Sequence, residues 1–168
     1  MYGKEVADDM LQNWRPYKDA CLYILSNEED PASQVYVRNK KSKCQEQGIG
    51  CEVFNISHAN ILDVRNLLKN YIPTKGRNYI IFQKPLPEQL QPYERELDRF
   101  LAKHPKMDID AFEGDLTTEF KTPATPLGII KMLDYYVGLK NLDGMNAVVI
   151  GRSKIVGEPV ARLLTKLN

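Results

Sequence analysis

The sequence predicts an α/β fold in which a mostly parallel sheet lies between two layers of helices. Three observations support this prediction. Apolar runs of strand length alternate along the chain with segments whose apolar residues recur at helical spacing. The runs at 20–25, 78–82 and 147–150 are continuous or nearly so in apolar residues, as expected of buried strands, whereas 52–56 alternates. Proline and glycine stand at the ends of the expected elements, where they start or stop regular structure.

The first half of the chain contains most of the expected elements. Asp30 and Pro31 supply an N-cap and a first-turn proline for a helix that Gly48 ends. Pro85 and Pro87 end the third strand. In order, we expect a helix over about 4–14, a strand over 20–25, a helix over 30–47, a strand over 52–56, a helix over 61–72, a strand over 78–82 and a helix over about 88–102.

The second half begins with a long segment, His104–Pro126, that has no clear period. A segment of this length usually serves a function or links domains. We expect a helix from Leu127 to Tyr136, with Thr125 and Pro126 at its start. Ala147–Ile150 then predicts a buried strand, and a helix over about 159–167 follows it. One strand–helix unit leaves both strand edges unpaired, so we expect the rest of this sheet to come from a further segment or from another chain.

The composition excludes several classes of protein. Lysine and arginine number 23 against 22 aspartate and glutamate residues, and a net charge of +1 argues against binding nucleic acid or an acidic membrane through bulk charge. The longest apolar runs, such as Tyr79–Phe82, are far shorter than the roughly 20 residues of a membrane helix. No apolar signal segment follows Met1. The three cysteines are odd in number and lack metal-ligand spacing, so we expect a soluble cytoplasmic protein without a metal site.

The first motif that could carry chemistry is Tyr36-Val37-Arg38-Asn39-Lys40. Residues four apart share a helix face, so the Tyr36 hydroxyl and the Lys40 ammonium can converge on one point. A lysine beside an apolar wall and other cations can exchange protons near neutral pH. The same segment also fits an ordinary solvated helix face. Its Tyr-x-x-x-Lys spacing occurs in short-chain dehydrogenases too, but those enzymes carry a glycine-rich loop upstream, and Gly3 is the only glycine before Tyr36.

Two further motifs follow the third expected strand. Gln83-Lys84-Pro85-Leu86-Pro87 stands at its carboxyl end, where open α/β sheets bind ligands. Gln83 could orient a lysine or a substrate because its amide both donates and accepts hydrogen bonds, or it is simply a polar residue where a strand exits. Asp108 and Asp110 could each accept two hydrogen bonds from adjacent N–H groups of a heterocycle, or cap a turn.

The fourth motif runs from Val149 to Pro159 and joins the last expected strand to the last helix. A glycine turn at Gly151 would aim backbone N–H groups at an anion. The spacing of Gly151 and Gly157 differs from the generic G-x-G-x-x-G dinucleotide fingerprint. Arg152 at the strand end could meet a ribose 2′-phosphate, which would favour NADP over NAD. A plain strand–helix turn is the alternative.

Taken together and in this order, these segments resemble the bifunctional methylenetetrahydrofolate dehydrogenase / methenyltetrahydrofolate cyclohydrolase family. The resemblance spans nearly the whole chain and covers the family's amino-terminal catalytic domain and the opening of its cofactor domain. It is carried by five segments: 31–40 (PASQVYVRNK), 83–87 (QKPLP), 108–110 (DID), 122–129 (TPATPLGI) and 151–159 (GRSKIVGEP).

The resemblance implies a three-layer parallel-sheet catalytic domain over residues 1–122 that binds folate. It implies, over residues 123–168, a linking helix and the first strand–helix unit of a Rossmann-type NADP-binding domain. The implied activity is oxidation of 5,10-methylenetetrahydrofolate to 5,10-methenyltetrahydrofolate with NADP, followed by hydrolysis to 10-formyltetrahydrofolate. The resemblance also implies a homodimer.

The resemblance assigns roles to residues by their position in the motifs. Lys40 would transfer protons in the hydrolytic step, and Gln83 would hold Lys40 in place. The substrate would contact Tyr36, Pro85, Leu86 and Asp110, the last of these at the pterin edge. The cofactor phosphates would lie at Gly151, Arg152 and Ser153.

Several positions differ from the usual residues of the family. Lys84 stands where a leucine usually contacts folate, Ala111 where glycine is usual, and Ala124 where cysteine is usual. The stretch between Asp110 and Pro123 is also shorter than the family norm. Lys84 and Ala111 support the alternative that the chain is a truncated or degenerate, non-catalytic folate-binding or assembly module.

Overall fold

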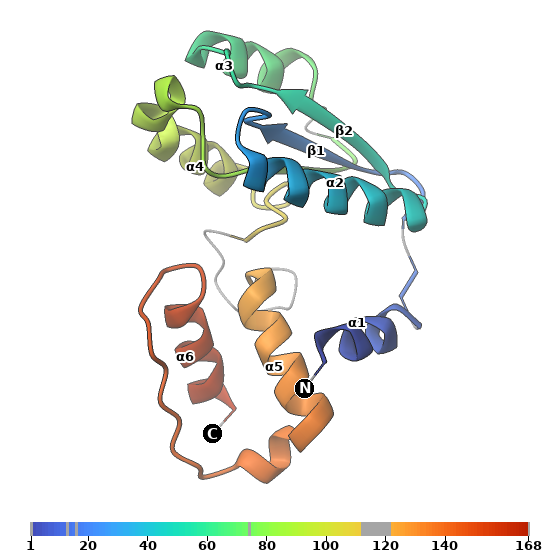
Figure 1. Ribbon diagram of the computed structural model, residues 1–168, viewed down its shortest axis with the longest axis vertical. Coiled ribbons are helices and arrows are strands. Elements are labelled where there is room, and N and C mark those ends of the chain that lie inside the picture. Colours follow the sequence, from blue (N-terminus) through green and yellow to red (C-terminus); the bar gives the residue numbers. More distant parts are fainter. Residues whose placement is uncertain (1, 13, 16, 74, 112–121, 168) are drawn as a thin grey trace. The chain divides into compact units, whose positions relative to one another are not determined.

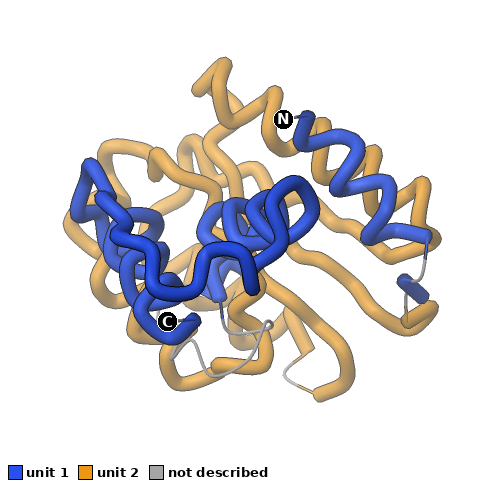
Figure 2. Tube along the Cα trace, turned by 90° about the horizontal axis from the view of Figure 1, so that it is seen from below, with its two compact units in different colours: residues 1–15, 110–168 blue, residues 16–109 orange. Residues whose placement is uncertain are grey.

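The computed structural model describes residues 2–12, 14–15, 17–73, 75–111 and 122–167. The chain divides into two compact units, drawn in different colours in Figure 2. Unit 1 comprises Met1–Arg15 and Asp110–Asn168, and unit 2 comprises Pro16–Ile109. The middle of the long aperiodic segment, residues 112–121, lies outside the described residues.

Unit 2 is built on a parallel sheet of three strands, β1 (Ala20–Ser26), β2 (Gly50–Asn55) and β3 (Arg77–Phe82). The spatial order is β2-β1-β3, so the first strand of the sequence lies in the middle. Leu25 is in register with Phe54 on one side and with Phe82 on the other. The carboxyl ends of all three strands therefore lie at one edge of the sheet.

Side chains alternate across the sheet and divide the core of unit 2 into two layers. Ile24 and Ile81 face α2 (Pro31–Glu46) and pack with its buried Cys44. Leu25 and Phe82 face the other side, where α3 (Ile61–Asn70), the 3₁₀ helix η1 (Glu88–Tyr93) and α4 (Glu94–Lys103) supply the covering apolar residues. Figure 1 shows α2 and α3 on opposite sides of the strands. The predicted α/β fold with helices on both faces of a parallel sheet is confirmed.

The helix start and stop signals act as predicted in unit 2. The Asp30 carboxylate accepts a hydrogen bond from the Ser33 backbone N–H at 2.7 Å and caps α2. Gly48, just after α2, has a φ of +69°, which glycine adopts without a steric penalty. The single helix expected over 88–102 is wrong in its first part, because Pro92 lies within 88–93 and that stretch forms η1 instead.

Unit 1 contains α1 (Gly3–Gln12), α5 (Ala124–Val137), the 3₁₀ helix η3 (Leu139–Leu142) and α6 (Gly157–Lys166). Helix α5 contacts both α1 and α6. The Tyr136 hydroxyl of α5 ties down the amino-terminal segment, because it accepts a hydrogen bond from the Tyr2 backbone N–H at 2.8 Å and bonds the Glu5 carboxylate at 2.7 Å. Since α5 begins at Ala124, Thr125 lies within its first turn instead of capping it, and Pro126 is a first-turn proline as predicted.

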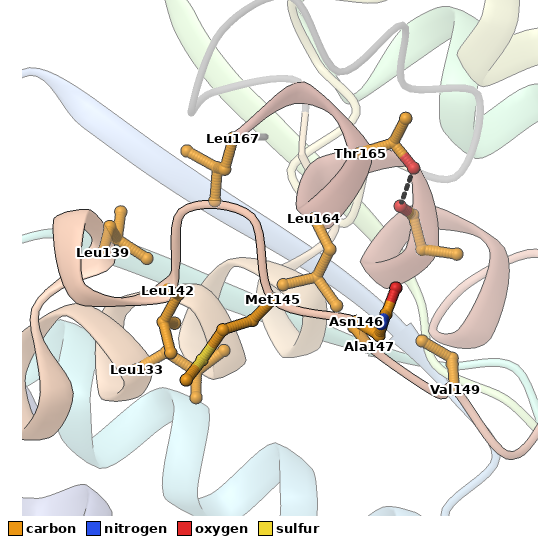
Figure 3. A pocket seen from close by; sticks show the side chains of 11 residues that line it. Leu133, Leu139, Leu142, Met145, Asn146, Ala147, Val149, Leu164, Thr165 and Leu167 are labelled. Carbon is orange, nitrogen blue, oxygen red and sulfur yellow. Dashed lines mark hydrogen bonds between the residues drawn. The ribbon is translucent and has the colours of Figure 1, made fainter.

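The strand expected over Ala147–Ile150 is not formed, and this prediction is wrong for the described chain. The segment pairs with no strand among the described residues, and Val148 and Ile150 are 87% and 99% exposed. A strand needs a neighbour for its backbone groups, and apolar residues alone do not supply one. A hollow of about 590 Å³ lies beside this segment (Figure 3); its lining includes Leu133, Leu139, Leu142, Met145, Val149 and Leu164.

No helix in the described parts of the chain is long and apolar enough to cross a membrane.

The three cysteines of unit 2 are free thiols; Cys44 and Cys51 lie at the contact between α2 and the sheet, and Cys21 packs against the opposite core layer. Burial raises the pKa of the Cys51 thiol from 9.0 to about 11, and the neighbouring Cys44 adds to this increase. Burial also raises the pKa of the Cys44 thiol. Thiols held in the neutral form are weak nucleophiles, so this cluster is a packing feature.

We expect the free energy of unfolding to fall as the pH rises from about 9 to 11. Because the folded pKa of Cys51 lies above the unfolded value, the unfolded chain loses this proton first, and the stabilisation present below pH 9 is lost as the pH approaches 11. Urea midpoints measured at intervals over this range would check it. The decrease in unfolding free energy between pH 9 and 11 should be smaller in Cys51→Ala. An equal decrease in the two proteins would contradict the assignment of this pH dependence to Cys51.

Candidate active site

The carboxyl end of β3 carries the first predicted site residue, Gln83. Its backbone N–H donates to the Leu25 carbonyl at 2.9 Å, so the ladder between β1 and β3 continues one residue beyond Phe82. Because side chains alternate along a strand, Gln83 points to the same face as Ile81, which is the face covered by α2. The Gln83 side chain is buried there.

Lys40 reaches Gln83 from α2. The Lys40 ammonium donates a hydrogen bond to the Gln83 Oε1 atom at 2.8 Å. The Gln83 Nε2 atom donates to the Lys84 backbone carbonyl at 3.0 Å, which leaves the amide oxygen as the atom facing Lys40. The structure therefore brings together two residues that are 43 positions apart in the sequence.

The other residues predicted to contact substrate have different environments. Tyr36 lies one turn before Lys40 on α2 and is 60% exposed; in the described chain no hydrogen bond joins the two side chains. Pro85 is exposed, and the Lys84–Pro85 peptide bond is cis. Leu86 is buried and packs in the core layer that includes Phe82 and Leu90. The Tyr36 and Pro85 side chains are thus accessible to a ligand, whereas the Leu86 side chain anchors the turn after β3 in the core.

Unit 2 also has a hollow, of about 480 Å³, which runs along another face of α2. Val37, Arg38, Lys41 and Val53 are among its lining residues, and Lys40 and Gln83 are not. The candidate site is therefore defined by the bond between Lys40 and Gln83 and not by this hollow.

A charged cluster that the sequence did not predict stands next to Gln83. The Lys84 ammonium bonds the Glu94 carboxylate and lies 3.4 Å from the Asp98 carboxylate. Burial lowers the pKa of Lys84, but its bonds and charge interactions with Glu94 and Asp98 outweigh burial and raise it overall. In the sequence, this cluster is indicated only by the spacing of Glu94 and Asp98, which puts both carboxylates on one face of α4.

The segment that carries the two aspartates lies along β3. The Ile80 backbone N–H donates to the Met107 carbonyl at 2.7 Å, and Asp108 forms a parallel bridge with Ile80. Asp108 is buried, and Asp110, two residues later, is partly buried at the start of the second stretch of unit 1. Ala111 has a φ of +52°, so alanine adopts a left-handed conformation at the position where the family usually has glycine.

The glycines of the 151–157 turn in unit 1 allow a close approach of two backbone segments. A Cβ atom on Gly157 would lie 2.4 Å from the Gly151 carbonyl oxygen, and Gly151 itself has a φ of +128°. The Ser153 hydroxyl accepts hydrogen bonds from the Val156 and Gly157 backbone N–H groups at 3.2 and 3.3 Å. The side chains of Arg152 and Ser153 are exposed at this turn, ahead of α6.

Family models match both halves of the chain. Residues 1–110 match the catalytic domain of tetrahydrofolate dehydrogenase/cyclohydrolase, and residues 123–168 match its NAD(P)-binding domain. The chain belongs to the tetrahydrofolate dehydrogenase/cyclohydrolase family. The resemblance inferred from the five sequence segments is thereby confirmed.

Curated relatives and solved structures of this family agree with the match. The bifunctional protein FolD 1 of Acinetobacter baylyi is 38% identical over 98% of the chain, and FolD of Staphylococcus aureus is 34% identical over 99%. The chain covers 59% and 61% of these two proteins, so it spans about three fifths of their length.

Among solved structures, the bifunctional FolD methylenetetrahydrofolate dehydrogenase/cyclohydrolase of Campylobacter jejuni has a TM-score of 0.71 at 28% identity, over 98% of this chain and 58% of its own. A 5,10-methylenetetrahydrofolate dehydrogenase from the silkworm Bombyx mori has a TM-score of 0.63 at 29% identity, over 96% of this chain and 55% of its own.

Proposed function

We propose that this chain acts in one-carbon tetrahydrofolate metabolism as a methylenetetrahydrofolate dehydrogenase (NADP) / methenyltetrahydrofolate cyclohydrolase. It would oxidise 5,10-methylenetetrahydrofolate to 5,10-methenyltetrahydrofolate and hydrolyse that product to 10-formyltetrahydrofolate. The observation that carries the proposal is the hydrogen bond of 2.8 Å between the Lys40 ammonium and the buried Gln83 amide, at the carboxyl edge of a parallel sheet.

The hydrolytic step needs a group that moves protons. Water adds to the methenyl carbon, the bond from that carbon to N5 breaks, one water proton passes to N5 and the other is released to solvent. A lysine amine can accept the first proton and deliver it to N5. Gln83 would fix the direction of the Lys40 side chain, because its amide oxygen accepts from Nζ and its amide nitrogen is held by the Lys84 carbonyl.

Around this pair we propose the substrate contacts. The ring of Tyr36 and the exposed face of Pro85 would pack on folate, with Leu86 forming the buried base of the same turn. The Asp110 carboxylate would accept hydrogen bonds from the pterin edge. The catalytic domain would extend over residues 1–122, and residues 123–168 would form the linking helix and the opening of the Rossmann-type domain.

The residues of the 151–157 turn fit a dinucleotide. A glycine at 157 is required by its contact with the Gly151 backbone, and α6 begins directly behind the turn, so the positive end of its helix dipole favours a phosphate there. Gly151, Arg152 and Ser153 would hold the phosphates, with the Arg152 guanidinium at the 2′-phosphate of NADP. When bound, NADP would supply the hydride acceptor for oxidation of the methylene carbon.

Three further proposals concern the state of the protein. We propose a homodimer, which light scattering of the purified chain would test. The three free cysteines support a location in the reducing cytoplasm. The net charge of +1 supports the absence of a nucleic-acid partner.

An assay with two readouts on the chain itself tests the proposed function. NADP reduction with 5,10-methylenetetrahydrofolate reports the dehydrogenase, and the decay of methenyl absorbance reports the cyclohydrolase. We expect both. Hydrolysis without reduction would overturn the dehydrogenase part of the proposal. Folate binding with neither activity would replace the proposal by the non-catalytic module.

We expect Asp110→Ala to weaken folate binding by more than about 1.5 kcal/mol, because the carboxylate would make charge-assisted hydrogen bonds to the pterin. Isothermal titration calorimetry with the tetrahydrofolate substrate measures this change. Glu88→Ala, an exposed acid at the start of η1, is the control and should bind as the unaltered chain does. Equal affinities of Asp110→Ala and the control would remove Asp110 from the site.

A further inference from the structure

The residue directly after Gln83 is tethered to a helix on the other face of the sheet. The Lys84 ammonium bonds Glu94 at the first residue of α4 and lies 3.4 Å from Asp98, one turn later. The three side chains are only 29–43% exposed, so solvent screens their charges less than it screens fully exposed charges. Lys84 is thus the charged counterpart of two carboxylates that would otherwise repel each other on one helix face.

The backbone of Lys84 is part of the candidate active site. Its carbonyl oxygen accepts the hydrogen bond from the Gln83 Nε2 atom at 3.0 Å. That bond decides which end of the Gln83 amide faces Lys40, because the nitrogen is committed to Lys84 and the oxygen is left to accept from the ammonium at 2.8 Å. Both ends of the Gln83 amide are therefore bonded, the nitrogen to the Lys84 carbonyl and the oxygen to the Lys40 ammonium.

We propose that Lys84 is a positioning residue: its ionic tether to Glu94 and Asp98 on α4 fixes the turn after β3, and through the Lys84 carbonyl it fixes the Gln83 amide that orients Lys40. The inference rests on the proposed function for its catalytic consequence. The tether accounts for a lysine at a position where the family usually has leucine. The side chain at this position, which in the family usually contacts folate, here bonds two carboxylates of α4.

The test compares three variants of the full chain. Lys84→Met removes the charge and keeps an unbranched side chain, and Lys84→Arg keeps a cation that can bond both carboxylates. Arg65→Met is the matched control, because Arg65, on α3, forms an ion pair of 2.7 Å with Glu96 of α4, the helix that also carries Glu94 and Asp98. We expect Lys84→Met to lower the turnover number for methenyltetrahydrofolate hydrolysis by about ten- to a hundredfold, with KM changed less than about twofold. Lys84→Arg should recover most of the loss, and Arg65→Met should behave as the unaltered chain does.

A spectroscopic readout tests the inference without any substrate. The side-chain amide protons of Gln83, assigned by their absence in Gln83→Met, should exchange with solvent about fivefold faster in Lys84→Met, because the hydrogen bond to the Lys84 carbonyl opens more often. The same protons should keep their rate in Arg65→Met. If Lys84→Met does not fold, the double variant Glu94→Gln and Asp98→Asn removes the tether from the other side and should give the same two effects.

Failure of the inference and failure of the proposed function give different results. An unaltered chain with no hydrolytic activity contradicts the proposed function, and the amide exchange still decides whether Lys84 positions Gln83. An active chain in which Lys84→Met changes neither turnover nor amide exchange overturns the inference. Equal effects of Lys84→Met and Arg65→Met would also overturn it, since they would reflect a general loosening of α4.

Discussion

Lys40→Met is expected to lower the rate of methenyltetrahydrofolate hydrolysis by about 10²- to 10⁴-fold, the usual contribution of a positioned general acid or base. Methionine keeps an unbranched apolar side chain and removes the amine that bonds Gln83 at 2.8 Å. The buried Gln83 oxygen then loses a donor, which costs about 1–3 kcal/mol, well within the stability of an ordinary domain of about 5–15 kcal/mol. The variant should therefore fold and bind folate while its turnover collapses.

The decay of methenyl absorbance measures the rate, and circular dichroism with a urea titration measures the fold. Lys41→Met is the matched control, because Lys41 is the next residue of α2 and is exposed. It should hydrolyse the substrate at the rate of the unaltered chain. Turnover in Lys40→Met that equals this control would defeat the assignment of Lys40 to proton transfer.

Phe82→Ala is expected to lower the free energy of unfolding of unit 2 by about 3–5 kcal/mol, because it removes a large side chain from a packed core. Phe82 is 2% exposed, ends β3 and packs in the layer with Leu25 and Leu90. Its backbone precedes Gln83, so the cavity would form directly behind the candidate active site. Chemical denaturation with urea, followed by circular dichroism, measures the loss.

Phe54→Ala on β2 is the comparison variant. Phe54 is only partly buried and stacks on Tyr23, so its removal should cost clearly less than that of Phe82. A loss below about 1.5 kcal/mol for Phe82→Ala, or one no larger than that for Phe54→Ala, would show that the core packing described for unit 2 is incorrect.

The fold of unit 2 could be predicted closely because each of its elements carries its own local signals. The Asp30 cap and the Gly48 stop set the ends of α2 to within a residue. β1 and β3 were recognisable because they carry continuous apolar runs, as strands of a buried parallel sheet do, and β2 because its residues alternate. Ala147–Ile150 has the same apolar character, yet it forms no strand here, because pairing depends on a neighbour that local sequence does not reveal.

The candidate site could be predicted only in part. Lys40 and Gln83 stood in recognisable segments, one on a helix and one at a strand end, and side-chain alternation puts Gln83 on the face of that helix. The tether of Lys84 to Glu94 and Asp98 could not be predicted, because it joins a strand exit to a helix ten and fourteen residues later, across a 3₁₀ turn. Tertiary contacts of this kind depend on how the helix packs against the sheet, and neither hydrophobic periodicity nor composition predicts that packing.

The exposed segment around Val148 and Ile150 has a practical consequence for the purified protein. Unpaired backbone groups flanked by bare apolar side chains serve as a template for self-association, and a net charge of +1 gives the molecules little mutual repulsion at neutral pH. Colloidal stability should therefore be poorest near neutrality and improve in buffers that charge the surface. Kinetic measurements made on dilute protein away from the isoelectric point will report the chemistry of the dissolved protein and not the turbidity of its aggregates.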